Sequence, residues 1–157
     1  ESCCGINNAV CINFIDNCNG VANCRGCMVF KKAMTERRKL NLGHTFAHAV
    51  ETLAQRNVYE ISHGEAVAMG LVLAARLSDR VFHGDMDTPT ALEAKVSADL
   101  SDCGLCPDCP FPVDEMAEIM SKDKKAEGGR VHFVLIREIG DVVLYDLTVE
   151  EVCRLLA

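Results

Sequence analysis

The segment from Ser62 to Ser78 constrains the fold more than any other part of the chain. Past its first turn it is apolar on nearly every side, and a helix without a polar face has to be buried. Ser62 followed three residues later by Glu65 forms a capping box, which predicts where the helix begins. Gly64 and Gly70 would allow another helix or a ligand to approach it closely. The sequence therefore predicts a helix inside the core of a folded domain.

A second helical pattern precedes this segment, from about Ala33 to Leu53. His44, His48 and Glu51 fall together on one face of that helix. Four apolar residues recur on another face and are expected to point into the core: Leu42, Phe46, Val50 and Leu53. An apolar side combined with a side of ligand-type groups is typical of a helix that lines a binding site.

The remaining patterns predict a mainly α fold with one small β-hairpin near the C-terminus. Strand residues alternate in polarity, whereas the helices carry capping residues at their starts. The other expected elements are a helix at about 7–16, a helix starting at Thr88–Pro89, a loop at 103–112, a short helix at about 114–121, a hairpin at 131–145 with its turn near Gly140–Asp141, and a final helix capped by Thr148 and Glu151.

Composition fits one domain and disfavours two classes of partner. A chain of 157 residues that is 49% hydrophobic can bury one core. The formal net charge of -7 argues against general nucleic-acid binding, which needs a basic face. No apolar run reaches the roughly 18 residues that a membrane span requires, and no signal peptide opens the chain. We therefore expect neither nucleic acid nor membrane as a partner.

Ten cysteines are many for a chain of this length. In a small secreted protein they would indicate disulfides, but residues 28–102 lack cysteine and are well patterned for helices. Reduced thiols in a cytoplasmic protein are therefore favoured. CxxC spacings occur at Cys24–Cys27 and within 103–109, and two such pairs can form a structural zinc site. Their separation is far longer than such sites usually have.

Three of the five histidines are placed to converge on a metal ion. His44 and His48 lie four residues apart on one helix, and His63 opens another. Neutral imidazoles from two helices commonly bind zinc, although each histidine is also explained by hydrogen bonds in a core. A zincin protease is disfavoured because Thr45 stands where that motif requires glutamate.

Two histidines leave a catalytic zinc site incomplete, since it needs three protein ligands and an open position. Glu51 and Glu65 are nearby carboxylates, but Glu51 also fits a solvated or supporting group and Glu65 a helix cap. Basic residues in the same region form either a solvated helix face or an anion site for phosphate or carboxylate. They are Lys31, Lys32, Arg37, Arg38 and Lys39, with a second group at Lys124 and Lys125.

Two long motifs, Arg37 to Glu51 and Ser62 to Ala68, resemble 3-dehydroquinate synthase. Shorter stretches at 120–125 and 131–140 resemble the C-terminal part of that family, in the right order. The resemblance implies a helical metal- and substrate-binding domain at 31–157. A divergent or truncated segment would precede it at 1–30, and the family's NAD-binding α/β domain would be absent.

The resemblance also implies an activity in the shikimate route to aromatic amino acids. The family converts 3-deoxy-arabino-heptulosonate 7-phosphate to 3-dehydroquinate with elimination of phosphate. It uses NAD and a divalent metal, zinc or another such as cobalt, and the full-length enzyme is a homodimer. Carried over by position, His44 and His63 match metal ligands, His48 a catalytic proton-transfer group, and Arg37, Asn41 and Lys124 or Lys125 substrate-binding residues.

The sequence departs from the family in ways that keep alternatives open. The family's third metal ligand, a glutamate, lies further upstream than the residues that precede His44, and Ala33 replaces a usual acidic residue. By itself the chain is therefore expected not to complete the reaction. The alternatives are another sugar-phosphate cyclase, a non-catalytic remnant of such an enzyme, and a cysteine–zinc interaction module.

Overall fold

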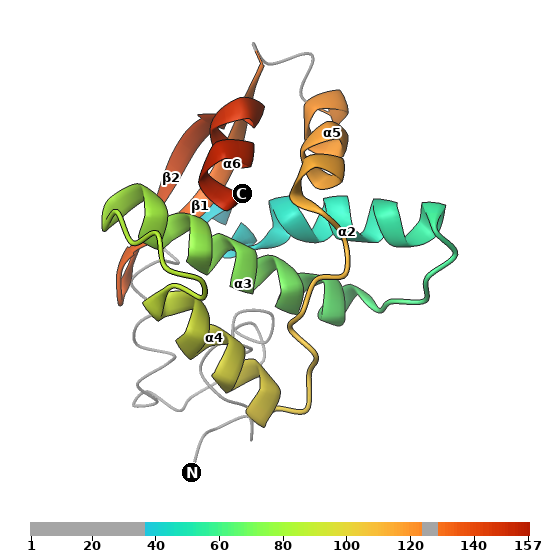
Figure 1. The fold of residues 1–157 in the computed structure, drawn as a ribbon, viewed down its shortest axis with the longest axis horizontal. Coiled ribbons are helices and arrows are strands. Elements are labelled where there is room, and N and C mark those ends of the chain that lie inside the picture. Colours follow the sequence, from blue (N-terminus) through green and yellow to red (C-terminus); the bar gives the residue numbers. More distant parts are fainter. Residues whose placement is uncertain (1–36, 124–128) are drawn as a thin grey trace.

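A computed structural model describes residues 37–123 and 129–157, which form helices and one hairpin (Figure 1). The helix expected at 7–16, and the whole of segment 1–30, lie outside the described residues. In order, the elements are η2 (Arg37–Asn41), α2 (His44–Arg56), α3 (His63–Phe82), α4 (Ala91–Asp102), α5 (Val113–Asp123), β1 (Arg130–Glu138), β2 (Asp141–Thr148) and α6 (Val149–Leu156). The expected mainly α fold with one hairpin is confirmed.

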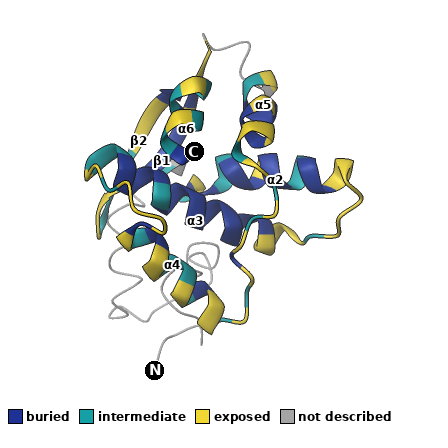
Figure 2. Ribbon diagram, viewed as in Figure 1, coloured by how far each residue is buried: buried dark blue, intermediate teal, exposed yellow. Residues whose placement is uncertain are grey.

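Helix α3 is the central element, and α2, α4, α6 and β1 pack around it (Figure 1). It is buried along nearly its whole length past the first turn, as its apolar sequence predicts (Figure 2). The capping box at its start is also confirmed, since Ser62 and Glu65 each accept a hydrogen bond from the other's backbone N–H. The helix continues to Phe82, one turn beyond the expected end. Among the described helices, none is long and apolar enough to cross a membrane.

The start predicted for the preceding helix is wrong within the described residues. A short 3-10 helix, η2, comes first, and α2 begins only at His44. Gly43 separates them because it adopts a left-handed conformation with φ 79°. Its backbone also touches α3: a Cβ on Gly70 would lie 2.2 Å from the Gly43 carbonyl oxygen. The expected close approach at Gly70 is therefore confirmed, whereas Gly64 has nothing within 4 Å of a Cβ position.

The four apolar residues predicted to face the core are buried in the structure. Phe46 of α2 packs on Phe133 of β1, with ring centroids 5.2 Å apart. Helix α2 packs through its apolar face on α3 and α5 and reaches β1 through Phe46, which leaves the histidine face turned outward. The buried residues are Leu42, Phe46, Val50 and Leu53.

The helix predicted to start at Thr88–Pro89 starts later. Thr90 caps α4, and its hydroxyl accepts from the N–H of Glu93, whose side chain accepts from the N–H of Thr90. Thr88 has Ala91, not a glutamate, three residues on, so only Thr90 can satisfy two backbone donors at once. The loop expected at 103–112 is confirmed between α4 and α5.

The hairpin closes one side of the core. Its strands pair antiparallel with Val131 opposite Leu147 and Phe133 opposite Tyr145. The turn includes Gly140 with φ 94°, as expected, and the buried residues of β1 face the helices. The backbone N–H of Ile136 donates to the buried hydroxyl of Ser78 on α3, at 2.9 Å. Thr148 and Glu151 form the predicted capping box of α6.

Candidate metal centre

Helices α2 and α3 bring the three predicted histidines together at one end of their contact. The ring centroids of His44 and His63 are 5.7 Å apart, and those of His44 and His48 are 6.2 Å apart. Both pairs meet edge to face. Residues that are distant in the sequence thus form one cluster, as the two helix patterns predicted.

Local sequence fixes where two of these histidines stand. His44 is the first residue of α2 because left-handed Gly43 ends the turn before it. His63 is the first residue of α3 because the Ser62 capping box starts that helix. Each ring therefore projects from the first turn of a helix whose start is determined by its neighbours.

One nitrogen of each of these two rings already has an oxygen partner. Nδ1 of His44 lies 3.3 Å from the carbonyl oxygen of Leu42, and Nδ1 of His63 lies 2.9 Å from Oε1 of Glu51. Both oxygens are acceptors, so Nδ1 carries the hydrogen in each neutral ring and Nε2 carries the lone pair. Among the described residues nothing is hydrogen-bonded to Nε2 of either ring.

This arrangement fits two ligands of a divalent metal ion. Metal-binding histidines usually donate the other ring N–H to a carbonyl or carboxylate, as both do here. Two imidazoles that share one zinc ion at about 2.0–2.1 Å have centroids roughly 5–6 Å apart. The observed 5.7 Å agrees with that spacing.

The third ligand is not supplied by the part of the chain that the structure describes. There, no group of three or more histidine, cysteine, aspartate or glutamate side chains is arranged to hold a metal ion. Glu65 is occupied in the capping box, where hydrogen bonds from Ser62 lower the pKa of its carboxyl. Glu51 faces the ring of His63 instead. The sequence-based expectation of an incomplete site stays a prediction, because residues 1–36 and 124–128 lie outside the described residues.

Burial favours the neutral imidazole of His44. Removal from water lowers the pKa of its imidazole, and the neighbouring rings of His63 and His48 lower this pKa further. The hydrogen bond to the Leu42 carbonyl raises the pKa, but by less than burial lowers it. A lowered pKa favours the neutral imidazole, which is the form that binds metals. His63, by contrast, is 56% exposed in its side chain.

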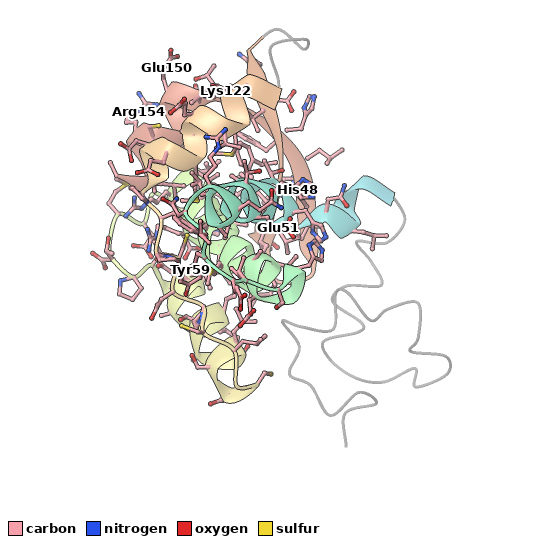
Figure 3. All side chains as sticks on the ribbon, turned by 90° about the vertical axis from the view of Figure 1, so that its right-hand side faces the viewer. His48, Glu51, Tyr59, Lys122, Glu150 and Arg154 are labelled. Atoms are coloured by element: carbon pink, nitrogen blue, oxygen red, sulfur yellow. The ribbon has the colours of Figure 1, made fainter. Side chains whose placement is uncertain are left out.

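Among His48 and the predicted substrate-binding residues, the structure describes some side chains and not others. His48 is exposed and lies with Glu51 on the same side of α2 (Figure 3). Asn41 is exposed at the end of η2, three residues before His44. Arg37 begins η2, but its side chain lies outside the described part, as do all of Lys124 and Lys125.

Two features beside the cluster were missed by the sequence analysis. The hydroxyl of Thr45 donates to the carbonyl oxygen of His132 on β1, at 3.1 Å, so the hairpin contacts the first turn of α2. An open cavity of about 480 Å³ lies beside Glu51, between the end of α2 and the start of α3, and Tyr59 and Glu60 help line it. No local sequence signal reveals a contact between residues 87 positions apart.

The described cysteines do not form a metal site. Cys103, Cys106, Cys109 and Cys153 are all free. Burial raises the pKa of the Cys109 thiol, whose sulfur donates to the carbonyl oxygen of Phe111 at 3.7 Å. A raised pKa disfavours the thiolate that binds zinc. The Cys24–Cys27 pair lies outside the described residues.

The two described strands do not provide a nucleotide-binding unit either. They form a single antiparallel hairpin, whereas a dinucleotide fold needs parallel strands joined through helices. The described residues therefore do not fit an NAD site.

Comparison with known proteins shows which proteins this chain is similar to. The family model described as 3-dehydroquinate synthase C-terminal matches residues 30–126. The chain is 40% identical over 131 residues to 3-dehydroquinate synthase of Thermococcus kodakarensis, which covers 78% of the chain and 36% of that protein. It is also 45% identical over 109 residues to 3-dehydroquinate synthase of Acidithiobacillus ferrooxidans. That match covers 69% of this chain and 28% of that protein. The chain spans about a third of the length of such curated relatives.

Solved structures of related cyclases share the fold. A 2-epi-5-epi-valiolone synthase from Streptomyces hygroscopicus, with NAD+ and Zn2+ bound, matches with a TM-score of 0.55 and 26% identity, over 84% of this chain and 36% of that chain. A 2-deoxy-scyllo-inosose synthase, complexed with carbaglucose-6-phosphate, NAD+ and Co2+, matches with a TM-score of 0.51 and 20% identity. That match covers 74% of this chain and 32% of that chain. At that identity the second likeness bears on the fold alone.

Proposed function

Because the chain belongs to the 3-dehydroquinate synthase C-terminal family, we propose that it forms the metal- and substrate-binding part of a 3-dehydroquinate synthase. Such an enzyme converts a seven-carbon sugar-acid phosphate to 3-dehydroquinate and phosphate. The observation that carries the proposal is the pairing of His44 and His63, with centroids 5.7 Å apart and both Nδ1 atoms held by oxygen acceptors.

In this proposal His44 and His63 hold a divalent metal through Nε2. A metal held there would supply Lewis-acid polarisation of a substrate alcohol, and NAD held outside the described residues would supply the redox chemistry. His48 lies one helical turn from His44 and is exposed, so its ring is free to reach a substrate and move a proton. The valiolone synthase that is 26% identical to this chain, solved with NAD+ and Zn2+ bound, supports both cofactors.

Substrate binding would fall to groups next to the metal ligands. Asn41 is exposed just before His44, and Arg37 precedes it by one turn of η2. Lys124 and Lys125 would add positive charge for the phosphate or carboxylate of the substrate. We propose that the third metal ligand and the NAD site come from outside the described residues, since these fit neither.

A second candidate, another sugar-phosphate cyclase, is favoured by one observation. The valiolone synthase shares the fold with a TM-score of 0.55 over 84% of this chain. Its identity is 26%, against 40% for the Thermococcus kodakarensis 3-dehydroquinate synthase. The higher identity supports 3-dehydroquinate synthase as the first choice.

Substrate preference separates the two candidates. Calorimetric titration of the zinc-loaded chain with 3-deoxy-arabino-heptulosonate 7-phosphate should show binding about tenfold tighter than with glucose 6-phosphate, because only the former has a carboxylate for the basic groups. Asn41→Ala should weaken the binding of the former. Equal affinity for the two phosphates, or tighter binding of glucose 6-phosphate, would contradict the assignment.

A further inference from the structure

Glu51 connects the two helices of the candidate metal centre. It lies on α2 one turn after His48, and its Oε1 reaches Nδ1 of His63 at the start of α3, at 2.9 Å. Its side chain is 29% exposed. The carboxylate therefore comes from the helix that carries His44 but contacts the ring that projects from the other helix.

A carboxylate in this place determines which nitrogen of His63 is available. Ionised glutamate only accepts hydrogen bonds, so Nδ1 of the neutral ring must carry the hydrogen and Nε2 must carry the lone pair. The contact also restricts rotation of a ring that is otherwise 56% exposed. Both effects present Nε2 of His63 as a ligand atom beside His44.

We propose that Glu51 is a positioning residue, which holds His63 in the Nδ1–H tautomer and orientation needed to bind the metal. The inference rests on the proposed function for its metal, but the tautomer is a property of the metal-free chain. His44 has a corresponding partner in the carbonyl oxygen of Leu42. Only the partner of His63 is a side chain, and it is therefore the one that a mutation can remove.

The geometry favours this role over direct ligation by Glu51. Oε1 is committed to Nδ1, and the lone pair of Nε2 points away from Nδ1 across the ring, so a metal on Nε2 lies away from that oxygen. Glu65, the other carboxylate near the start of α3, is engaged by the backbone N–H of Ser62 at 2.8 Å. Glu60 is exposed and lines the same cavity as Glu51, which makes it a matched control.

The first measurement is the tautomer of His63 in the metal-free, 15N-labelled chain by NMR at about pH 8, where histidine is neutral. Wild type should show His63 as the Nδ1–H form. Glu51→Ala should convert His63 to the Nε2–H form, while the signals of His44 stay unchanged. Glu51→Gln should retain part of the Nδ1–H form, because the amide oxygen still accepts. Glu60→Gln should leave His63 as in wild type.

The second measurement is zinc affinity of the same variants by calorimetry. Glu51→Ala should bind zinc about 10- to 100-fold more weakly, and Glu51→Gln should fall between it and wild type. An unchanged His63 tautomer in Glu51→Ala would overturn the proposal, and so would unchanged zinc affinity. A loss of zinc without a change of tautomer would also overturn it, in favour of direct ligation.

Failure of the proposed function gives a different result. In that case wild type would bind no zinc through His44 and His63, whatever the tautomers are. The NMR comparison would still decide whether Glu51 sets the state of the His63 ring.

Discussion

The states of the His44 and His63 rings, the two proposed metal ligands, are set by different physical features. Burial lowers the pKa of His44 and keeps its ring neutral. His63 is more exposed, and the carboxylate of Glu51 selects its tautomer. A site that combines both features does not need either histidine to be fully buried, which leaves room for a substrate beside them.

Glu93 is a buried carboxylate whose charge should matter for stability. It is 5% exposed and forms a two-pronged ion pair with Arg76, in which the Arg76 Nε lies 2.9 Å from Oε2. Burial alone would raise the pKa of Glu93, but the Arg76 contact and the Thr90 N–H together lower it below the usual 4.5. Because the folded pKa is the lower one, this stabilisation is present above pH 4.5 and is lost as the pH falls through the folded pKa.

Glu93→Ala should therefore destabilise the chain by about 3 kcal/mol at neutral pH, since it leaves Arg76 half-buried without its partner. The free energy of unfolding of this variant should also fall less steeply below pH 4.5 than that of wild type. Urea denaturation between acidic and neutral pH measures both effects. Glu151→Ala removes the corresponding glutamate from the capping box of α6, where the helix start is more exposed. It should lower the free energy of unfolding by less than Glu93→Ala does. Equal losses for the two variants would contradict a special role for the buried ion pair.

At the scale of elements, the contact between Gly43 and Gly70 sets the distance between α2 and α3. A Cβ on Gly70 would lie 2.2 Å from the Gly43 carbonyl oxygen, where neither backbone can move without separating the helices. The two helices carry His44 and His63, so the spacing of the helices also sets the distance between the two proposed metal ligands.

Gly70→Ala should cost about 1–3 kcal/mol of unfolding free energy through overpacking and should weaken zinc binding. Gly64→Ala is its control on the same helix, because a Cβ there meets nothing within 4 Å. Gly64→Ala should raise the free energy of unfolding by up to about 1 kcal/mol, since alanine favours the helix more than glycine does. Thermal unfolding and zinc titration of the two variants test this, and a Gly70→Ala chain as stable as wild type would refute it.

Element types were predictable from the sequence more reliably than their starts. Periodicity and capping boxes identified the buried helix α3 and the final helix α6 correctly. The helix expected from Ala33 was broken by Gly43, because packing against α3 selects a left-handed backbone that periodicity does not reveal. The helix start predicted at Thr88–Pro89 was wrong, because that prediction used the proline as the start signal and not the capping box of Thr90 and Glu93.

At the scale of the whole molecule, α3, α5 and the contact with β1 hold the histidine-bearing face of α2 outward. Phe46 packs on Phe133, and the hydroxyl of Thr45 donates to the carbonyl oxygen of His132, so β1 contacts two adjacent residues in the first turn of α2. The sequence predicted the histidine cluster because spacing on two helices is a local signal. It did not predict the hairpin contact, because no local pattern encodes a pairing across 87 residues.

Zinc binding by calorimetry tests the central claim most directly. The wild-type chain is compared with His44→Ala combined with His63→Ala, with thiols reduced and, in a parallel sample, alkylated. His83→Ala is the control, because that histidine pairs with Asp79 at the far end of α3. The account predicts that binding survives alkylation and the His83 change but disappears with His44 and His63. Binding that persists in the double variant, or that is lost on alkylation, would contradict it.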